Sequence, residues 1–307
     1  MITTVCLNPA IDKSATVDHM QLLEVNRLRD IRTAIGGKGI NVAVVLKRLQ
    51  ADVCCVGFMG EADERFFMRG FSCEQLCFRA VLVPGNVRSN LKIIDADTLA
   101  VTEFNEQGAQ VTPAALEDLT KELYSTAEAS SYIALCGSLP PGCGADTYRK
   151  LMQTLPGKHW VVDATGEALR QALEMKPFLI KPNLAELEEL VQERLTTRDI
   201  IQAAAIKLCR AGTSHVAVSM GSDGALLTDG TKTVFAPALT VLAKSTVGAG
   251  DAMLAGMLYG LDRGETVFES LRYGIAAGAA CVQGGGAHAF HPEEFQRLLE
   301  HVTVTEI

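Results

Sequence analysis

The chain has 307 residues, of which 48% are hydrophobic and 27 are glycine. This length allows one large domain or two, and so many glycines suit an α/β protein with tight turns between strands and helices. The formal net charge of −8 argues against nucleic acid or an anionic membrane as the main partner. An anionic substrate would therefore have to be held by a local cluster of donors.

The cysteines and the hydropathy of the chain exclude several other classes of protein. The nine cysteines include no Cys-x-x-Cys pair, so neither a zinc site nor a disulfide framework is expected. No apolar stretch reaches the roughly 18 residues that span a membrane, and the chain starts on a strand-like run without a basic leader. We therefore expect a soluble, cytoplasmic protein.

The first strand is expected at residues 2–7, where an apolar run ends at Asn8-Pro9. Asp12 then lies near the carboxyl end of that strand, the edge where open α/β sheets bind ligands. A plain turn is an equally good interpretation of Asn8 and Asp12. Residues 14–35 lack the pattern of a crossover helix and carry several arginines, including Arg27. They predict an excursion from the main sheet.

A glycine-rich segment then opens an apolar helix. Its sequence is Gly36-Gly37-Lys38-Gly39-Ile40-Asn41, which is neither a Walker A loop nor the dinucleotide-binding Gly-x-Gly-x-x-Gly. The glycine cluster alone is a weak signal. Lys38 and Asn41 nevertheless place donors for a polar or anionic ligand at the start of the helix.

Three short strands are expected at residues 78–83, 89–94 and 99–104. The middle one is the most informative, because the period of two along a strand puts Arg88, Asn90 and Lys92 on one face. A solvated face is the simpler interpretation. If the strand belongs to a lid over the sheet, the same face would bind a phosphate group.

From residue 113 the pattern becomes a regular alternation of helices and strands. Strands are expected at 132–136, 159–163, 178–180 and 215–219, with helices of about ten residues between them and a hairpin-like pair at 225–228 and 233–235. Such alternation predicts a parallel sheet with right-handed crossovers. Ala-rich helices at about 250–261 and 266–282 and a short one at 293–300 close the chain.

Several strand ends on the same edge of that sheet carry polar residues, among them Ser138 and Asp163. Asn183 stands at an expected helix start with Glu186 three residues later. The pair fits a variant of the capping box, or a carboxylate that orders water on Mg²⁺. The turn from Ser219 through Gly221 to Gly224 is either a plain hairpin turn or a support for the phosphates of ATP. These sets are expected to meet in space.

The segment from Lys244 to Asp251 has the most specific pattern in the chain. Gly248, Ala249 and Gly250 precede Asp251, which lies in the first turn of a helix rich in Ala, Leu and Met. Helix N-termini bind anions through unpaired N–H groups and the helix dipole. Capping is the simpler role for an aspartate there, but capping alone does not need three small residues in a row. A base beside a bound anion is therefore favoured.

Together these motifs resemble the ribokinase-like (PfkB) carbohydrate kinase family over essentially the whole chain. Residues 36–41 resemble its first motif, 245–252 its second, and 183–186 its Asn-x-x-Glu motif. Within the family the chain is most similar to bacterial 1-phosphofructokinases and tagatose-6-phosphate kinases, which share residues 7–12, 137–140 and 181–183. Residues 88–92 and 102–105 resemble 1-phosphofructokinases in particular, with drift at Ser89 and Phe104.

The resemblance implies a single domain over residues 1–307 with a three-layer α/β/α architecture. A mostly parallel central sheet would carry a small β-sheet lid, formed by about 13–35 and 77–107, that closes to exclude water. ATP and Mg²⁺ would be used with a small sugar phosphate. An exposed edge of the lid makes a homodimer through the lid the expected assembly.

The resemblance also implies a role for individual residues. Asp251 would be the general base, with the turn from Gly248 through Ala249 and Gly250 as an anion hole. Residues expected at the sugar phosphate are Asp12, Arg27, Gly37, Lys38, Asn41, Arg88, Asn90, Lys92 and Ser138. Residues expected at the nucleotide are Asn183, Ser219, Gly221, Gly224, Thr246 and Gly250, with Glu186 at the metal.

Phosphorylation of fructose 1-phosphate by ATP is the favoured activity. Tagatose-6-phosphate kinase and 6-phosphofructokinase are the alternatives, and a non-catalytic sugar-phosphate sensor is more remote. A dinucleotide-binding oxidoreductase fails because its glycine fingerprint does not follow the first strand. His288 and His291 are expected in a surface loop, and Trp160 in the core.

Overall fold

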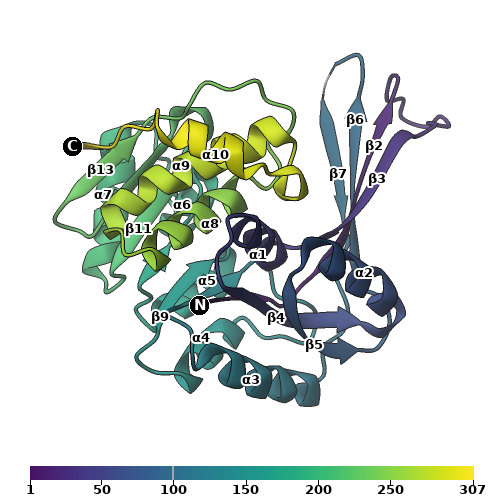
Figure 1. The fold of residues 1–307 in the computed structure, drawn as a ribbon, viewed down its shortest axis with the longest axis horizontal. Coiled ribbons are helices and arrows are strands. Elements are labelled where there is room, and N and C mark those ends of the chain that lie inside the picture. The colour runs from purple at the N-terminus through teal and green to yellow at the C-terminus, as the bar shows by residue number, and fades with distance from the viewer. Residues whose placement is uncertain (99) are drawn as a thin grey trace.

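The computed structural model describes residues 1–98 and 100–307, which form a large sheet between two layers of helices and a small sheet that projects from them (Figure 1). Within these residues the large sheet has the strand order β14-β13-β12-β11-β10-β9-β8-β1-β4-β5. Its strands are β1 (Ile2–Cys6), β4 (Val53–Gly60), β5 (Cys77–Val83), β8 (Tyr132–Cys136), β9 (His159–Asp163), β10 (Leu179–Ile180), β11 (His215–Ser219), β12 (Ala225–Thr228), β13 (Thr233–Ala236) and β14 (Thr305–Glu306).

The strands from β5 to β11 are parallel, and β12, β13 and β14 add an antiparallel end. β1 shows why the sheet has two buried faces. Ile2 and Cys6 belong to one apolar cluster, whereas Val5 and Leu7 belong to the other. This period of two sends alternate side chains into separate helix layers, as a parallel sheet covered on both sides requires.

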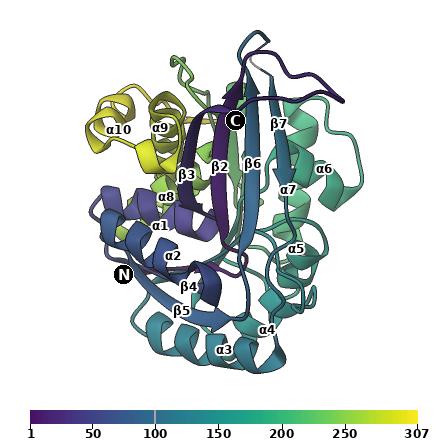
Figure 2. The ribbon, with the colours of Figure 1, turned by 90° about the vertical axis from the view of Figure 1, so that its right-hand side faces the viewer.

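Two groups of helices cover the two faces of the sheet (Figure 2). The first group is α1 (Lys38–Arg48), α2 (Glu64–Glu74), α8 (Ala249–Asp262), α9 (Val267–Gly284) and α10 (Pro292–Leu299). The second group is α3 (Pro113–Ala127), α4 (Thr147–Thr154), α5 (Gly166–Leu173), α6 (Leu184–Val191) and α7 (Arg198–Arg210). The expected three-layer architecture is confirmed. None of the helices in the described part of the chain is both long and apolar enough to cross a membrane.

Glycine and alanine allow α8 and α9 to lie very close together. A Cβ atom placed on Gly256 would come within 2.3 Å of the backbone oxygen of Tyr273. The expected buried helix after Asp251 is confirmed, since most of α8 is buried. Trp160 is also buried, as expected, and its indole N–H donates to the Leu155 carbonyl at 3.2 Å. The helix that begins with the anion-binding motif is thus anchored firmly in the core.

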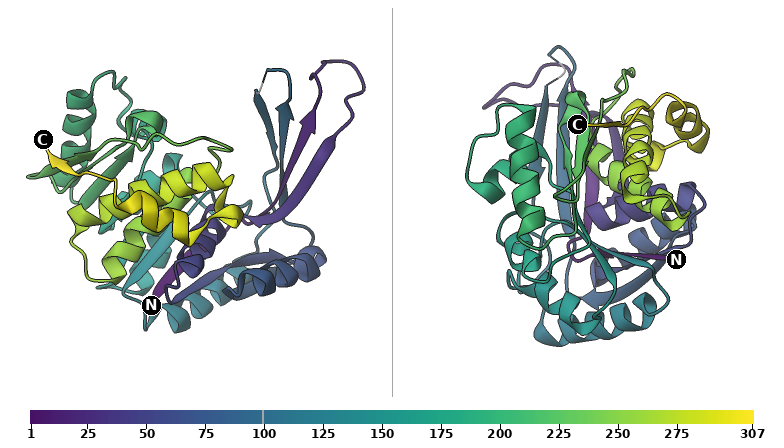
Figure 3. Two further views of the ribbon diagram at one scale, coloured as in Figure 1. Left: turned by 45° about the horizontal axis from the view of Figure 1, so that its top comes forward. Right: turned by 90° about the vertical axis from the view of Figure 1, so that its left-hand side faces the viewer.

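The small sheet has the order β3-β2-β6-β7 and stands away from the helices (Figure 3). Its strands are β2 (Ala10–Val17), β3 (Arg29–Gly36), β6 (Arg88–Asp95) and β7 (Val101–Asn105). One face carries a small apolar cluster of Ala15, Val17 and Ile93 with Met20 and Leu91. The segment expected at 13–35 therefore lies in β2, β3 and their connection. Leu99, the expected first residue of the last strand, lies outside the described residues.

The expected second lid segment, about 77–107, is wrong at its beginning. β5 belongs to the large sheet, where it pairs in parallel with β4 from Cys54 opposite Cys77 to Gly60 opposite Val83. Phe78 also stacks on Phe71 of α2, with ring centroids 4.2 Å apart. The sequence grouped residues 78–83 with the two short strands that follow, but β5 is the edge strand of the large sheet. The small sheet resumes only at Arg88.

Candidate active site

The candidate site forms where the carboxyl ends of the parallel strands meet the N-termini of α1 and α8, and the small sheet rises from the same edge (Figure 3). Asp251, in the first turn of α8, is 7% exposed. Its burial, together with the nearby charge of Asp163, raises the pKa of its carboxyl group to about 6. Asn41 in α1 donates from Nδ2 to Asp251 Oδ2 at 2.8 Å. The two glycine-rich helix starts therefore meet at one carboxylate.

The turn before Asp251 has the open backbone that an anion site needs. Gly248 has a φ of 78°, a conformation that favours glycine. The Ala249 N–H donates to the Thr246 carbonyl at 3.3 Å. Among the described residues the N–H groups of Gly250 and Asp251 have no backbone acceptor, and a Cβ atom on Gly250 would lie 3.4 Å from Lys181 Nζ. The turn thus offers two free donors beside an ammonium group.

Two lysines converge on Asp163, the last residue of β9. Lys38 Nζ lies 3.0 Å from Asp163 Oδ1, and Lys181 Nζ lies 3.4 Å from Asp163 Oδ2. Burial favours the neutral acid, but the charges of Lys181 and Lys38 hold the pKa of Asp163 below its usual value. Burial likewise opposes the charge on Lys38, yet neighbouring carboxylates raise its pKa. Because these charges are paired, a deeply buried polar cluster remains ionised.

Asn183 and Glu186 form the capping box at the start of α6. Asn183 Oδ1 accepts from the Glu186 N–H at 2.9 Å, and Glu186 Oε2 accepts from the Asn183 N–H at 2.9 Å. The simpler interpretation of this pair is therefore confirmed. Glu186 Oε1 is left facing Lys38 Nζ at 3.5 Å. In the described part of the chain no group of three or more His, Cys, Asp or Glu side chains could hold a metal ion.

Ser219 lies beside this capping box, because Asn183 and Ser219 form a parallel bridge at neighbouring strand ends. The turn that follows closes by a bond from the Met220 N–H to the Gly224 carbonyl at 2.8 Å. A Cβ atom on Gly224 would meet the Ala236 oxygen at 2.1 Å, whereas one on Gly221 would meet nothing within 4 Å. Hairpin packing thus accounts for Gly224, while Gly221 faces open space. Thr246 is exposed.

The small sheet brings its polar face to the site at its base. Asp12 of β2 lies opposite Asn90 of β6 in register, and Asn90 Nδ2 donates to Asp12 Oδ1 at 2.8 Å. A Cβ atom on Gly36 would meet Asp12 Oδ2 at 2.2 Å, so Asp12 also lies against the first glycine-rich motif. Lys92 lies further along β6, 3.8 Å from Glu103. The expected alternation of faces along this strand is confirmed.

Comparison with known proteins identifies the family of this chain. The family model for pfkB family carbohydrate kinases matches residues 5–294. This chain belongs to the PfkB family of carbohydrate kinases. It is 37% identical to a 1-phosphofructokinase of Rhodobacter capsulatus, over 99% of this chain and 97% of that protein. It is 35% identical to a 1-phosphofructokinase of Escherichia coli K12, over 92% and 90% respectively.

A solved structure of phosphofructokinase-2 from Escherichia coli in complex with substrates and products is similar to this chain, with a TM-score of 0.91, 28% identity and 98% of each chain covered. The ribokinase-like fold and the sugar-kinase class expected from the sequence are therefore confirmed. The protein is a phosphotransferase with an alcohol group as acceptor.

Not every expected residue reaches the site of this PfkB kinase. Arg27 is exposed in the connection between β2 and β3, at the end of the small sheet far from Asp12 (Figure 1). Within the chain it is therefore not brought to the expected sugar phosphate. Arg88 is at the base of the small sheet, but its Nε donates to the Asn8 carbonyl at 3.2 Å.

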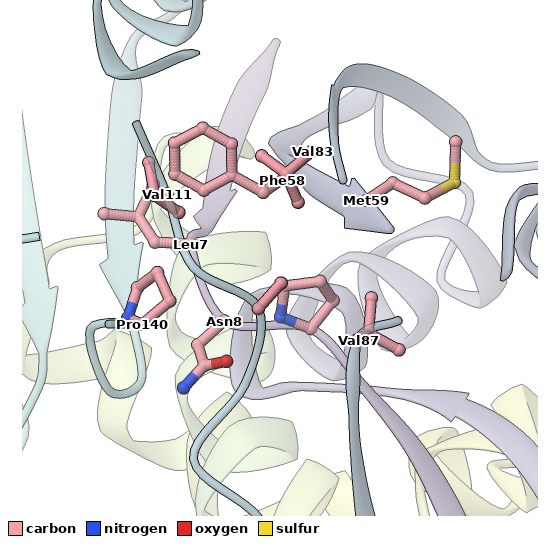
Figure 4. Close-up of a pocket in the computed structure, with 10 residues that line it drawn as sticks. Leu7, Asn8, Phe58, Met59, Val83, Val87, Val111 and Pro140 are labelled. Atoms are coloured by element: carbon pink, nitrogen blue, oxygen red, sulfur yellow. The ribbon is translucent and has the colours of Figure 1, made fainter. Parts of the chain in front are cut away.

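The sequence left Asn8 open between a turn residue and a residue of the ligand-binding edge, and in the structure it joins the parts of the site. Its buried side chain donates from Nδ2 to the Gln107 carbonyl at 3.0 Å and to Ser138 Oγ at 3.1 Å. Figure 4 shows this amide beside a small apolar cavity lined by residues that include Leu7 and Pro140. Asn8 thus contacts both the segment that follows the small sheet and the loop that carries Ser138.

The sequence named Asp163 as a polar strand end but gave it no role, and Lys181 was missed as a site residue. A signal was available, because each stands at a strand end on the ligand-binding edge.

The expected surface position of His288 is wrong. The side chain is half-buried, with Nδ1 at 2.8 Å from Glu74 Oε1 and Nε2 at 2.7 Å from the Ile35 carbonyl. His288 lies in the short helix η3 (Ala287–Ala289) directly after α9, so the chain folds back onto α2 and β3. His291, in contrast, is exposed, as expected.

Proposed function

We propose that this kinase transfers the γ-phosphoryl group of ATP to the free terminal hydroxyl of fructose 1-phosphate, giving fructose 1,6-bisphosphate and ADP. The observation that carries the proposal is Asp251, a buried carboxylate with a raised pKa beside free backbone N–H groups. The choice of sugar is supported by relatives named 1-phosphofructokinase that align with almost the whole chain.

In the proposed reaction, Asp251 accepts the proton of the acceptor hydroxyl while that oxygen bonds to the γ-phosphorus. The bond from the γ-phosphorus to the bridging oxygen of ATP breaks, and ADP leaves with that oxygen. The N–H groups of Gly250 and Asp251 stabilise charge on the transferred group. Lys181 lies close enough to the turn to add a positive charge to the same region.

The sugar phosphate would lie between the first glycine-rich motif and the base of the small sheet. Asp12 and Asn41 are proposed to bind hydroxyl groups, with Gly37 leaving room for the sugar and Lys38 and Ser138 at its edge. Arg88, Asn90 and Lys92 would face the existing phosphate, since guanidinium and ammonium groups suit a phosphate dianion. Arg88 would exchange its present backbone acceptor for that phosphate.

The nucleotide is proposed to lie along Asn183, Ser219, Gly221, Gly224 and Thr246. Mg²⁺ retains several waters and takes only one or two carboxylates besides phosphate oxygens, so Glu186 alone would serve as its protein partner. When bound, the ion neutralises charge on the phosphates of ATP. Glu186 would hold a coordinated water through the oxygen that now faces Lys38.

We also propose a homodimer formed through the small sheet, which would act as a lid over the site in a cytoplasmic enzyme. Large apolar side chains are exposed on this sheet and its connections. They are Leu22, Leu23, Val25, Leu28, Ile31, Val101 and Phe104. Apolar patches of this kind mark contact surfaces between proteins.

A substrate panel tests the function. We expect kcat/KM for fructose 1-phosphate to exceed that for tagatose 6-phosphate and for fructose 6-phosphate at least tenfold, measured as ADP release with MgATP. A higher kcat/KM for tagatose 6-phosphate or for fructose 6-phosphate would show that the enzyme is a kinase of that sugar phosphate instead. The similarity to phosphofructokinase-2 makes fructose 6-phosphate the important competitor. Absence of ADP with every sugar phosphate would favour a sensor instead.

A further inference from the structure

The most unusual side chain outside the residues used above is His288. Each of its ring nitrogens faces an acceptor at short range, the Glu74 carboxylate on one side and the Ile35 carbonyl on the other. A neutral imidazole has only one N–H, so it would leave one lone pair facing another. The geometry is satisfied only when both nitrogens carry hydrogen.

The charged groups around this ring complete a small network. Glu74 of α2 also accepts from Arg48 of α1, at 3.0 Å from both Nε and a terminal nitrogen of the guanidinium. Arg48 donates in turn to the Phe290 carbonyl at 2.9 Å. Burial opposes the charge on Glu74, but the bonds from His288 and Arg48 lower its pKa to about 2. The Glu74 carboxylate therefore stays ionised and remains an acceptor for Nδ1 of His288.

This network connects the two halves of the catalytic machinery. Ile35 is the next-to-last residue of β3 and leads through the glycines into α1, which carries Asn41. Ala287, the neighbour of His288, lies behind the anion-binding turn, where a Cβ atom on Gly248 would be 3.7 Å from the Ala287 nitrogen. A bond from His288 to the Ile35 carbonyl thus fixes the sugar side of the site relative to the phosphoryl side.

We propose that His288 is a positioning residue for phosphoryl transfer, and that its two ring contacts fix the root of β3 against the loop behind the Gly248 turn. Loss of the contact to Ile35 leaves the sugar-binding segment free to move away from Asp251. The inference rests on the proposed kinase activity but makes a separate statement about one ring and its two contacts.

The kinetic test uses His288→Phe, which keeps a flat ring and removes both bonds, with exposed His291→Phe as the matched control. We expect kcat/KM for the sugar phosphate to fall about 10–100-fold in His288→Phe, while KM for MgATP changes less than twofold. Glu74→Gln keeps an oxygen that can accept from Nδ1 of His288, so its kcat/KM should fall less than that of His288→Phe. Equal effects on both KM values, or an equal loss in Glu74→Gln, would overturn the proposal.

A direct measurement observes the ring of His288 in the wild-type enzyme. The wild-type enzyme labelled with ¹⁵N-histidine should show two protonated ring nitrogens for one of its six histidines at the pH of full activity. The Phe variants at 288 and 291 serve to assign that signal. A neutral single tautomer of His288 at that pH would refute the proposal. Because this spectrum needs no turnover, it separates a wrong role for His288 from a wrong choice of substrate.

Discussion

Asp251 shows the conflict between stability and chemistry within one side chain. Since its pKa is raised to about 6, the folded state binds this proton more tightly than the unfolded chain does. The free energy of unfolding therefore falls as the pH rises from the ordinary aspartate value to about 6, and the full cost remains above that range. The proposed role of Asp251 accounts for this cost, because a general base must be charged to accept a proton.

Asp251→Asn should consequently lower sugar-dependent turnover about 10²–10⁴-fold and raise the free energy of unfolding at pH 7 by about 1–3 kcal/mol. The gain in stability should disappear below about pH 4. In the wild type, kcat/KM should fall tenfold per pH unit below about 6. Kinetics from pH 5 to 8 measure the effects on turnover, and urea unfolding at pH 7 and below about pH 4 measures the effects on stability. Exposed Asp118→Asn on α3 is the control, and near-normal turnover of Asp251→Asn would exclude it as the base.

At the scale of elements, α6 shows how one carboxylate serves a helix and a site together. One oxygen of Glu186 completes the capping box, and the other faces Lys38. The two functions can be separated, because a glutamine at this position still accepts from the Asn183 N–H but has no charge. The helix start and the proposed metal partner therefore need not change together.

Glu186→Gln should leave the free energy of unfolding within about 0.5 kcal/mol of the wild type and should raise both KM for MgATP and the Mg²⁺ concentration needed for half activity. Asn183→Ala should cost about 1 kcal/mol, as the loss of a cap does. Thr197→Ala removes the cap of α7 and should affect stability alone. If Glu186→Gln proved kinetically silent, Glu186 would be only a capping residue.

At the scale of the whole molecule, the small sheet is the part with the least support from the rest of the chain. It projects from the body (Figure 1) and has only a small apolar cluster of its own. Sheets of few strands need a packed apolar face to be stable. Phe104 lies on the same face as Leu91 of that cluster, because the two residues are paired across β6 and β7. A second copy of the sheet would cover this face.

Phe104→Glu should therefore convert a dimer to a monomer in sedimentation equilibrium, and it should reduce sugar binding more than ATP binding. Tyr124→Glu on α3 is the matched control, since Phe104 is 52% exposed and Tyr124 is 54% exposed. A wild-type protein that stays monomeric at micromolar concentration would contradict the proposed assembly. Dissociation of the dimer by both Phe104→Glu and Tyr124→Glu would show that the interface is not specific to the small sheet.

The sequence by itself determined the α/β class, most of the elements and the motifs at both helix starts. These features have local signatures, such as the period of a strand, the glycines of a tight turn and the small residues before Asp251. The same signatures identified the capping box of Asn183 and Glu186, although they left its role open between helix and metal.

Only the tertiary structure decided which strands pair and which distant charges meet. The sequence grouped β5 with the strands of the expected lid, but its pairing with β4 places it in the large sheet. Lys38 and Asp163 are separated by 125 residues, and His288 and Ile35 by 253. Such contacts leave no local pattern, because they depend on packing of whole elements and not on spacing along the chain. The charge state of Asp251 likewise follows from burial that only the folded chain provides.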